Sequence, residues 1–307
     1  MNAQGGPCRS GCAAAALPER GFHMKKTVPA IVAAVALIFF LSCASGAYVH
    51  EWTDAENPAA FTPGAAPPIA AEIPVPAPPV AAVEPEPPSA RRYLERGIAF
   101  AGQGEFYAAM RDFTEAARLD PGLADAYLWR GFVRFGTGDM DSATVDFTQA
   151  VRLNPGLAHA HAWHGLVRFE KGDWSRALAD FTRALQLEPK DALLYAWRGS
   201  VHSSLGKFDR AIADYTNAIR LNPDFANAYN NRGVAYHEKG NLDRAIADFT
   251  RAILLAPDFA DAYNNRGLAH HGRGEPDRAV ADFEAALRIN PAHPHAGENL
   301  ETVRSAQ

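Results

Sequence analysis

Three tryptophans recur at a fixed spacing, and their side chains are suited to binding. Trp129, Trp163 and Trp197 lie 34 residues apart. A tryptophan offers a large apolar face together with one N–H donor, which suits an anchor for a partner molecule. The alternative is that the three rings fill gaps between packed helices.

Two pairs of asparagines share this spacing. Asn230 and Asn231 are followed 34 residues later by Asn264 and Asn265. A side-chain amide both donates and accepts hydrogen bonds, so it can pair with a peptide group whatever side chain that residue carries. The four amides are therefore candidates for holding an extended polypeptide.

Histidines raise the question of a metal site. His237 and His271 are also 34 residues apart, and stacked rings at this spacing could share a proton or an ion. His159, His161 and His164 lie on one predicted helix, but side chains two positions apart point to different faces. No acidic or cysteine ligand completes this second set, and we expect no metal site.

No group of residues forms a catalytic motif. The sequence contains no nucleophile–base constellation, no glycine-rich phosphate loop and no recognisable pair of carboxylates. Its three cysteines, Cys8, Cys12 and Cys43, all precede residue 44, so the part that folds has neither a disulfide nor a thiol nucleophile. We therefore expect that the protein is not an enzyme and uses no cofactor.

The recurring side chains belong to a repeat of 34 residues that starts at Ala90. The hexapeptide AYNNRG, for example, occurs at 228–233 and again at 262–267. Every row has glycine at positions 8 and 15, alanine at positions 20 and 27, an aromatic residue at position 24 and proline near position 32. The six predicted rows are 90–123, 124–157, 158–191, 192–225, 226–259 and 260–293.

Each row is expected to form two antiparallel helices, because two apolar stripes of helical period flank a glycine-centred turn. Glycine at position 15 can take the left-handed conformation that ends the first helix. The small residues at positions 8, 20 and 27 let helices approach, and the aromatic residue at position 24 fills the remaining space. Trp174 stands at position 17, where four other rows have Phe, Met or Leu, so we expect it in the core.

The pattern resembles the tetratricopeptide repeat, which has a period of 34 residues with glycine, alanine, aromatic and proline columns. The resemblance covers about two-thirds of the chain. It implies an all-α fold, a tetratricopeptide α-solenoid whose helix–turn–helix pairs stack into a right-handed superhelix with a concave groove. Residues 294–307 are expected to form a polar capping helix.

The family resemblance also implies where a partner binds. In this family the first helix of each pair lines the groove, with positions 2, 5, 6, 9, 12 and 13 facing inward. The candidate residues occupy such positions: Trp129, Trp163, Trp197, Asn231 and Asn265 at position 6, Asn230 and Asn264 at position 5, His237 and His271 at position 12. Asn231 and Asn265 match asparagines that clasp an extended peptide in several family members.

Rows two and three then form an apolar half of the groove and rows five and six a polar half. The basic clamp of chaperone-binding relatives, Lys at position 5 and Asn at position 9, is absent.

One departure from the family pattern recurs. Position 7, where an apolar residue is expected, is Arg in five rows and His164 in the third, and position 23 is Asp in all six. A half-buried charge needs a partner. We therefore predict that these Arg and Asp residues pair between packed helices.

Residues 24–47 have the pattern of a targeting segment, with two lysines followed by about 14 apolar residues. We expect Met24 to be the initiator and residues 1–23 to be an artefact of a wrongly assigned start codon. Three fates are open: lipidation of Cys43 in a lipoprotein-like Phe-Leu-Ser-Cys, cleavage near Ala47 by ordinary signal peptidase, or retention as a transmembrane helix of about 20 residues. Two of the three anchor the chain in a membrane.

A spacer is expected at 48–89. Of the 22 prolines in the chain, 11 lie between 58 and 88, and proline removes backbone donors that helices and sheets require. Such a tract behaves as an extended, semi-rigid linker. Docking to a partner through a PxxP motif is the alternative.

Charge and architecture together indicate a class of function. Residues 90–294 carry 25 Lys and Arg against 26 Asp and Glu, so the basic surface of a nucleic-acid binder is missing. We expect a non-catalytic scaffold of the bacterial cell envelope, anchored in a membrane only through its N-terminal segment and holding a protein or peptide in the groove. The alternative is a carbohydrate-binding or glycosyltransferase-associated module, because tryptophan ladders also stack on sugars.

Overall fold

The computed structural model describes residues 89–306, and every regular element in that range is an α-helix. The predicted targeting segment, Cys43 and all but the last residue of the predicted spacer lie outside the described residues. The helices are α2 (Ala90–Gly102), α3 (Phe106–Leu119), α4 (Ala124–Gly136), α5 (Met140–Leu153), α6 (Ala158–Glu170), α7 (Trp174–Leu187), α8 (Ala192–Ser204), α9 (Phe208–Leu221), α10 (Ala226–Glu238), α11 (Leu242–Leu255), α12 (Ala260–Gly272), α13 (Pro276–Ile289) and α14 (Ala296–Ser305).

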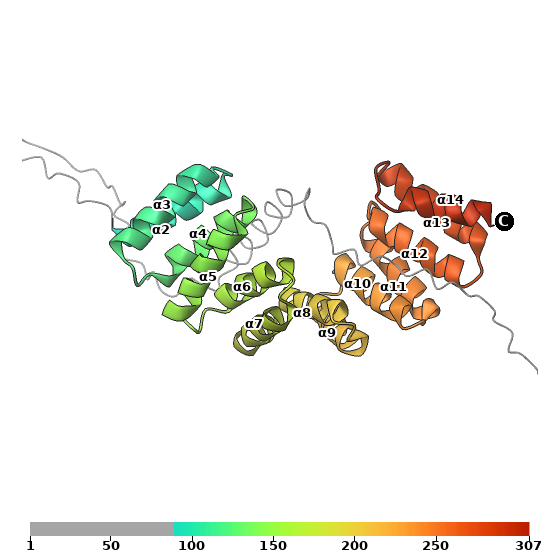
Figure 1. Ribbon diagram of the computed structural model, residues 1–307, viewed down its shortest axis with the longest axis horizontal. Coiled ribbons are helices and arrows are strands. Elements are labelled where there is room, and N and C mark those ends of the chain that lie inside the picture. Colours follow the sequence, from blue (N-terminus) through green and yellow to red (C-terminus); the bar gives the residue numbers. More distant parts are fainter. Residues whose placement is uncertain (1–88, 307) are drawn as a thin grey trace, which may run out of the picture. The chain divides into compact units, whose positions relative to one another are not determined.

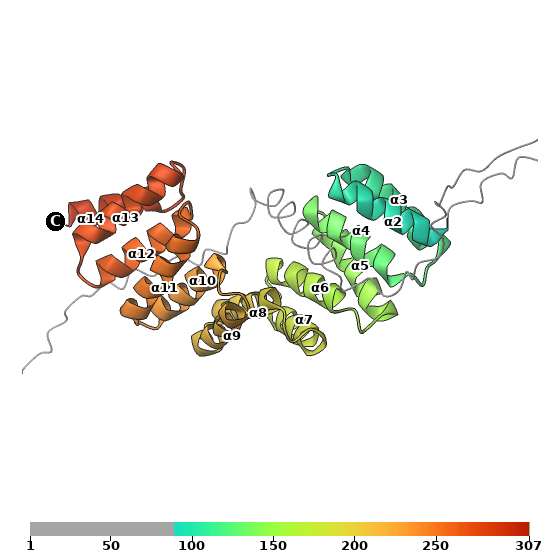
Figure 2. The same ribbon diagram turned by 180° about the vertical axis from the view of Figure 1, so that it is seen from behind.

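The helices form tandem antiparallel pairs. α2 packs on α3, α4 on α5, and so on to α12 on α13, and the second helix of each pair packs on the first helix of the next. Figures 1 and 2 show this succession from opposite sides, with each pair beside its sequence neighbours. α14 packs on α13 and α12, as the first helix of a further pair would. The fold is an α-solenoid, as predicted.

A glycine turn ends the first helix of each pair. All six glycines at position 15 have a positive φ, for example 68° at Gly206 and 73° at Gly240. A residue with a Cβ atom is strained in this left-handed region. The predicted role of this column is therefore confirmed.

The core of each pair is built around the aromatic residue at position 24. In the fifth row Phe249 is fully buried, and a Cβ atom added to Gly233 would lie 2.7 Å from its ring. Glycine at position 8 is thus required because the ring occupies the space that a side chain would need. The predicted close approach is confirmed.

Trp174 differs from prediction. Its side chain is 39% exposed, although the residue was expected in the core. It is the first residue of α7, and this end of the helix leaves part of the large ring in solvent.

No helix within residues 89–306 is both long enough and apolar enough to cross a membrane.

Candidate functional site

The first helices of the pairs form a continuous face. α4 contacts α2 and α6, and the same relation continues through α8, α10, α12 and α14. Among the described helices, by contrast, no second helix of a pair contacts another second helix. The first helices therefore lie closer together, as expected on the inner side of a curved stack. We call this surface the first-helix face.

Aromatic rings fill this face in its N-terminal half. The Trp163 ring centroid lies 4.9 Å from that of Phe132, 5.7 Å from that of Phe135 and 5.9 Å from that of Trp197. Trp163 is only 4% exposed and therefore belongs to the core, whereas Trp129 and Trp197 are partly exposed. A partner can reach the rings of Trp129 and Trp197 but not that of Trp163 in this conformation.

The asparagines bind one another between successive pairs. Asn265 Nδ2 donates to Asn230 Oδ1 at 3.0 Å, and Asn230 Nδ2 donates to Asn231 Oδ1 at 3.2 Å. One row further on, Asn299 Nδ2 donates to Asn264 Oδ1 at 2.9 Å. Asn230 and Asn264 are buried, while Asn231 and Asn265 are partly exposed. The latter two are the amides that a partner can reach.

Asn299 was not among the predicted site residues, although the sequence contained its signal. It lies 34 residues after Asn265, at position 6 of a seventh row, and the amphipathic pattern of α14 continues the repeat. The helix thus carries the asparagine column one step further.

Within residues 89–306, no hydrogen bond or ion pair joins His237 to His271. His237 is partly exposed, with its Nδ1 atom 3.7 Å from a carboxylate oxygen of Glu238, and His271 is exposed. Between residues 89 and 306, no three His, Cys, Asp or Glu side chains are grouped so as to hold a metal ion.

Two carboxylates on the first helices are partly buried. Burial raises the pKa of Asp125, while the positive charges of Arg91 and His159 act in the opposite direction. Burial also raises the pKa of Glu170. A cationic group brought by a partner would favour the charged form of either acid, because an opposite charge compensates for lost hydration.

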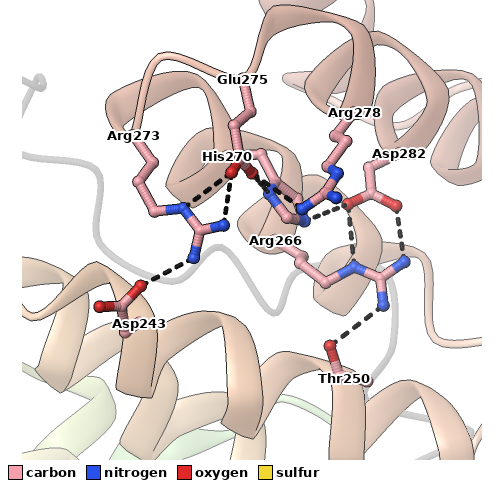
Figure 3. Close-up of polar contacts among 8 residues, drawn as sticks. All are labelled: Asp243, Thr250, Arg266, His270, Arg273, Glu275, Arg278 and Asp282. Carbon is pink, nitrogen blue, oxygen red and sulfur yellow. Dashed lines mark hydrogen bonds and ion pairs between the residues drawn. The ribbon is translucent and has the colours of Figure 1, made fainter.

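The Arg and Asp columns pair as predicted. In the fifth row Arg232 Nε and Nη2 donate to the two carboxylate oxygens of Asp248 at 2.7 and 2.8 Å. Arg232 Nη1 also donates to Thr216 Oγ1 of the preceding pair at 3.1 Å. Figure 3 shows the same arrangement in the sixth row. The remaining bidentate pairs are Arg96–Asp112, Arg130–Asp146 and Arg198–Asp214.

In the third row, the aspartate at position 23 is paired with an arginine at another position, because position 7 is His164. Arg168 Nη1, at position 11, donates to Asp180 Oδ2 at 2.7 Å, and His164 Nδ1 lies 3.6 Å from the same oxygen. Burial lowers the pKa of His164 to about 4, and the positive charges of Arg168 and His161 act in the same direction. Burial raises the pKa of Asp180 despite Arg168. His164 is therefore neutral at neutral pH.

Comparison with known families agrees with this architecture. A TPR repeat model matches residues 165–206 and 199–240, and two Tetratricopeptide repeat models match residues 94–158 and residues 226–259 and 260–293. This part of the chain therefore consists of tetratricopeptide repeats. No curated protein is significantly similar to the chain in sequence.

Solved structures share the fold. A chain of the APC/C hetero-tetramer Cut9–Hcn1 aligns with a TM-score of 0.62 and 23% identity over 70% of this chain and 42% of that one. YrrB, described as a TPR protein with an unusual peptide-binding site, aligns with a TM-score of 0.51 and 24% identity over 61% of this chain and 96% of its own. MamA aligns with a TM-score of 0.50 and 27% identity over 55% and 92% of the two chains. This chain thus spans less than half of the Cut9–Hcn1 chain that it resembles.

Proposed function

We propose that this protein is a non-catalytic scaffold that binds an extended segment of a protein partner along the first-helix face. Tetratricopeptide repeats in general mediate protein–protein interactions. The observation that carries the proposal is the arrangement of reachable groups on this face: partly exposed Trp129 and Trp197 in one half, and partly exposed Asn231 and Asn265 in the other. An apolar segment followed by an extended polar one complements both halves.

We further propose that the scaffold works in the bacterial cell envelope, with its repeats on the exported side of a membrane. The support is the sequence of residues 24–47, which combines lysines with an apolar run, and the proline-rich residues 58–88 that separate it from the repeats. Fractionation of cells that carry a C-terminally tagged chain tests this placement. Recovery in the membrane fraction, with the tag open to protease added from the periplasmic side, is expected. Recovery in the cytosol would contradict it.

Capture of partners from native envelope extract tests the binding face. The baits are the full-length chain and a Trp129→Ala/Trp197→Ala variant. Trp174→Ala serves as the matched control, because it removes a partly exposed tryptophan that begins α7, a second helix of a pair. All three baits must first show the same circular dichroism and thermal unfolding.

A protein retained by the full-length chain and by Trp174→Ala, but lost by the double variant, is the expected result. If all three baits retain the same proteins, the first-helix face is not the binding surface. Trp163 is left unchanged in every bait, because truncating a buried ring would open a cavity and confuse lost binding with lost stability.

A further inference from the structure

The sixth row contains a bound carboxylate, supplied by the chain itself. Glu275 Oε2 lies 2.6 Å from His270 Nδ1 and accepts from Arg278 Nη1 at 3.3 Å, and Oε1 accepts from Arg273 Nε at 3.1 Å (Figure 3). The hydrogen bonds from Arg273 and His270 lower the pKa of Glu275 to about 2. The other ring nitrogen, His270 Nε2, lies 3.9 Å from Asp282. In this row, one histidine and two arginines together bind a carboxylate.

The fourth row repeats part of this arrangement without the carboxylate, with Leu205 where the sixth row has Arg273. His202, Arg210 and Asp214 stand 68 residues before His270, Arg278 and Asp282, at the same repeat positions. His202 Nε2 lies 3.9 Å from Asp214 Oδ2, as His270 Nε2 does from Asp282, and in the sixth row this orientation brings Nδ1 to the residue at position 16. Position 16 is Lys207 here, a cation where the sixth row has its glutamate.

The substitution leaves an unsatisfied group. His202 Nδ1 is the one buried side-chain nitrogen or oxygen within residues 89–306 that has no hydrogen-bond partner, and His202 is only 7% exposed. Burial lowers the pKa of His202, and the charges of Arg198, Arg210 and Lys207 act in the same direction while that of Asp214 opposes them. In the tautomer that carries the proton on Nδ1, this buried N–H lacks an acceptor, and such a group is costly while it remains unpaired.

The α8–α9 turn, which follows His202 in the sequence, has a positively charged surface. Lys207 and Arg210 are exposed, and neither forms an ion pair with another described residue. A shallow hollow at the α8–α9 turn is lined by Gly206, Lys207, Phe208, Asp209, Arg210 and Lys239. Its one acid, Asp209, is paired with Lys239 and so does not neutralise the other cations. Because Lys207 is a long, flexible side chain, it can move aside and add its own ammonium group to an incoming anion.

We propose that His202, Lys207 and Arg210 form a binding site for a carboxylate, which an acidic side chain of a protein partner supplies. The bound carboxylate accepts from His202 Nδ1 and from Arg210, as Glu275 does from the corresponding groups of its own row. The site lies at the α8–α9 turn, so it adds a charged contact to the one proposed for the first-helix face and does not depend on that contact.

Nuclear magnetic resonance of the histidine rings tests the site in the full-length chain. Protein labelled with ¹⁵N-histidine is titrated with N-acetylglutamate amide at neutral pH, and with the neutral N-acetylglutamine amide as the control probe. His202→Gln and His270→Gln identify the two sets of signals. A saturable change at His202 Nδ1, with a dissociation constant in the millimolar range typical of one small contact, is expected from the glutamate probe alone. His270 serves as an internal control and should not respond, because its Nδ1 is already bonded to Glu275.

Two variants sharpen the result. Lys207→Glu places a carboxylate at position 16, so the His202 signals should resemble those of His270 without any probe, and the probe should no longer bind. Lys207→Gln should only weaken binding, by about tenfold for the loss of one charged contact.

Several outcomes would overturn the proposal: no saturable change at His202, equal changes at His202 and His270, or full binding to the Lys207→Glu variant. The chain also carries six acids between Glu51 and Glu86. If His202 shows the bound signature without probe and loses it when these acids are changed to glutamine, the chain fills its own site and the partner assignment is wrong.

Discussion

Replacing Asp248 by alanine should destabilise the repeats strongly, because it removes the counter-charge of a half-buried guanidinium. The Asp248 side chain is 9% exposed and that of Arg232 is 17% exposed. Breaking one partner of a buried ion pair typically costs about 3–5 kcal/mol. Arg232 keeps its hydrogen bond to Thr216 and its position over the ring of Tyr229, 5.6 Å from the centroid. We therefore expect the lower end of that range, about 3 kcal/mol.

Urea unfolding followed by circular dichroism measures this loss. Because repeat proteins do not always unfold in one step, amide hydrogen exchange in α10 and α11 should accompany it, to show where the stability is lost. Asp209→Ala is the matched control. It removes the acid of the Lys239–Asp209 ion pair, in which the Asp209 side chain is 84% exposed, and its effect should be close to zero.

A double-mutant cycle separates the pair from its surroundings. Arg232→Met/Asp248→Ala leaves no unpaired charge, so the double variant should be more stable than Asp248→Ala alone, with a coupling energy of about 1–3 kcal/mol. Equal losses for Asp248→Ala and Asp209→Ala, or a coupling energy near zero, would refute the reasoning. The paired columns would then be no more than neighbours in space.

Three further predictions concern a pair of glycines, His164 and Asn299. Gly233→Ala should cost about 1–3 kcal/mol, since its Cβ atom would lie 2.7 Å from a buried ring. In α14, a Cβ atom added to Gly297 would meet no other side chain or helix within 4 Å, so Gly297→Ala should instead stabilise the protein by about 0.5 kcal/mol. Urea unfolding that gave both substitutions the same sign would contradict this. The pKa of His164 is about 4 in the folded chain and about 6.5 in the unfolded chain. Between these pH values the unfolded chain binds more protons, so the free energy of unfolding should decrease as the pH falls from about 6.5 to about 4. His164→Arg, which copies the second row, should flatten this decrease, and unchanged pH dependence of urea unfolding would show that another group causes it. Asn299→Leu should cost about 1 kcal/mol, because Asn264 Oδ1 loses its donor, and unchanged hydrogen exchange in α14 would argue against that role.

The fold could be predicted because each column of the repeat has one dominant physical cause. A glycine that a ring crowds, such as Gly233, and a glycine in the left-handed region, such as Gly240, impose requirements that few other residues meet. The pairing of Arg232 with Asp248 was predictable for a similar reason, since a charge at a buried column needs a counter-charge nearby.

The state of the candidate binding residues could not be predicted in the same way. Trp163 occupies the same column as Trp129 and Trp197, yet it is buried because Phe132 and Phe135 of the preceding row close over it. Such burial depends on which neighbours are large, and this differs from row to row. The position of a residue in its repeat therefore indicates its face but not its exposure.

The unpaired nitrogen of His202 was likewise invisible in the sequence. It depends on the orientation of the buried ring, which places Nε2 rather than Nδ1 near Asp214. Asn230 raises a related point, because both ends of an amide predicted to hold a partner are already bonded to other asparagines.

The asparagine column has a consequence for how the length of the protein can change. The bond from Asn265 to Asn230 and the bond from Asn299 to Asn264 join residues with the same separation in sequence, so two successive junctions are chemically alike. A copy of residues 226–259 inserted after residue 259 would meet matching amides on both sides. Insertion among the second to fourth rows would instead separate rings that are fitted to particular neighbours, such as Trp163 and Trp197. We therefore expect the fifth row to tolerate duplication, whereas the second to fourth rows, whose rings are fitted to particular neighbours, would have to repack.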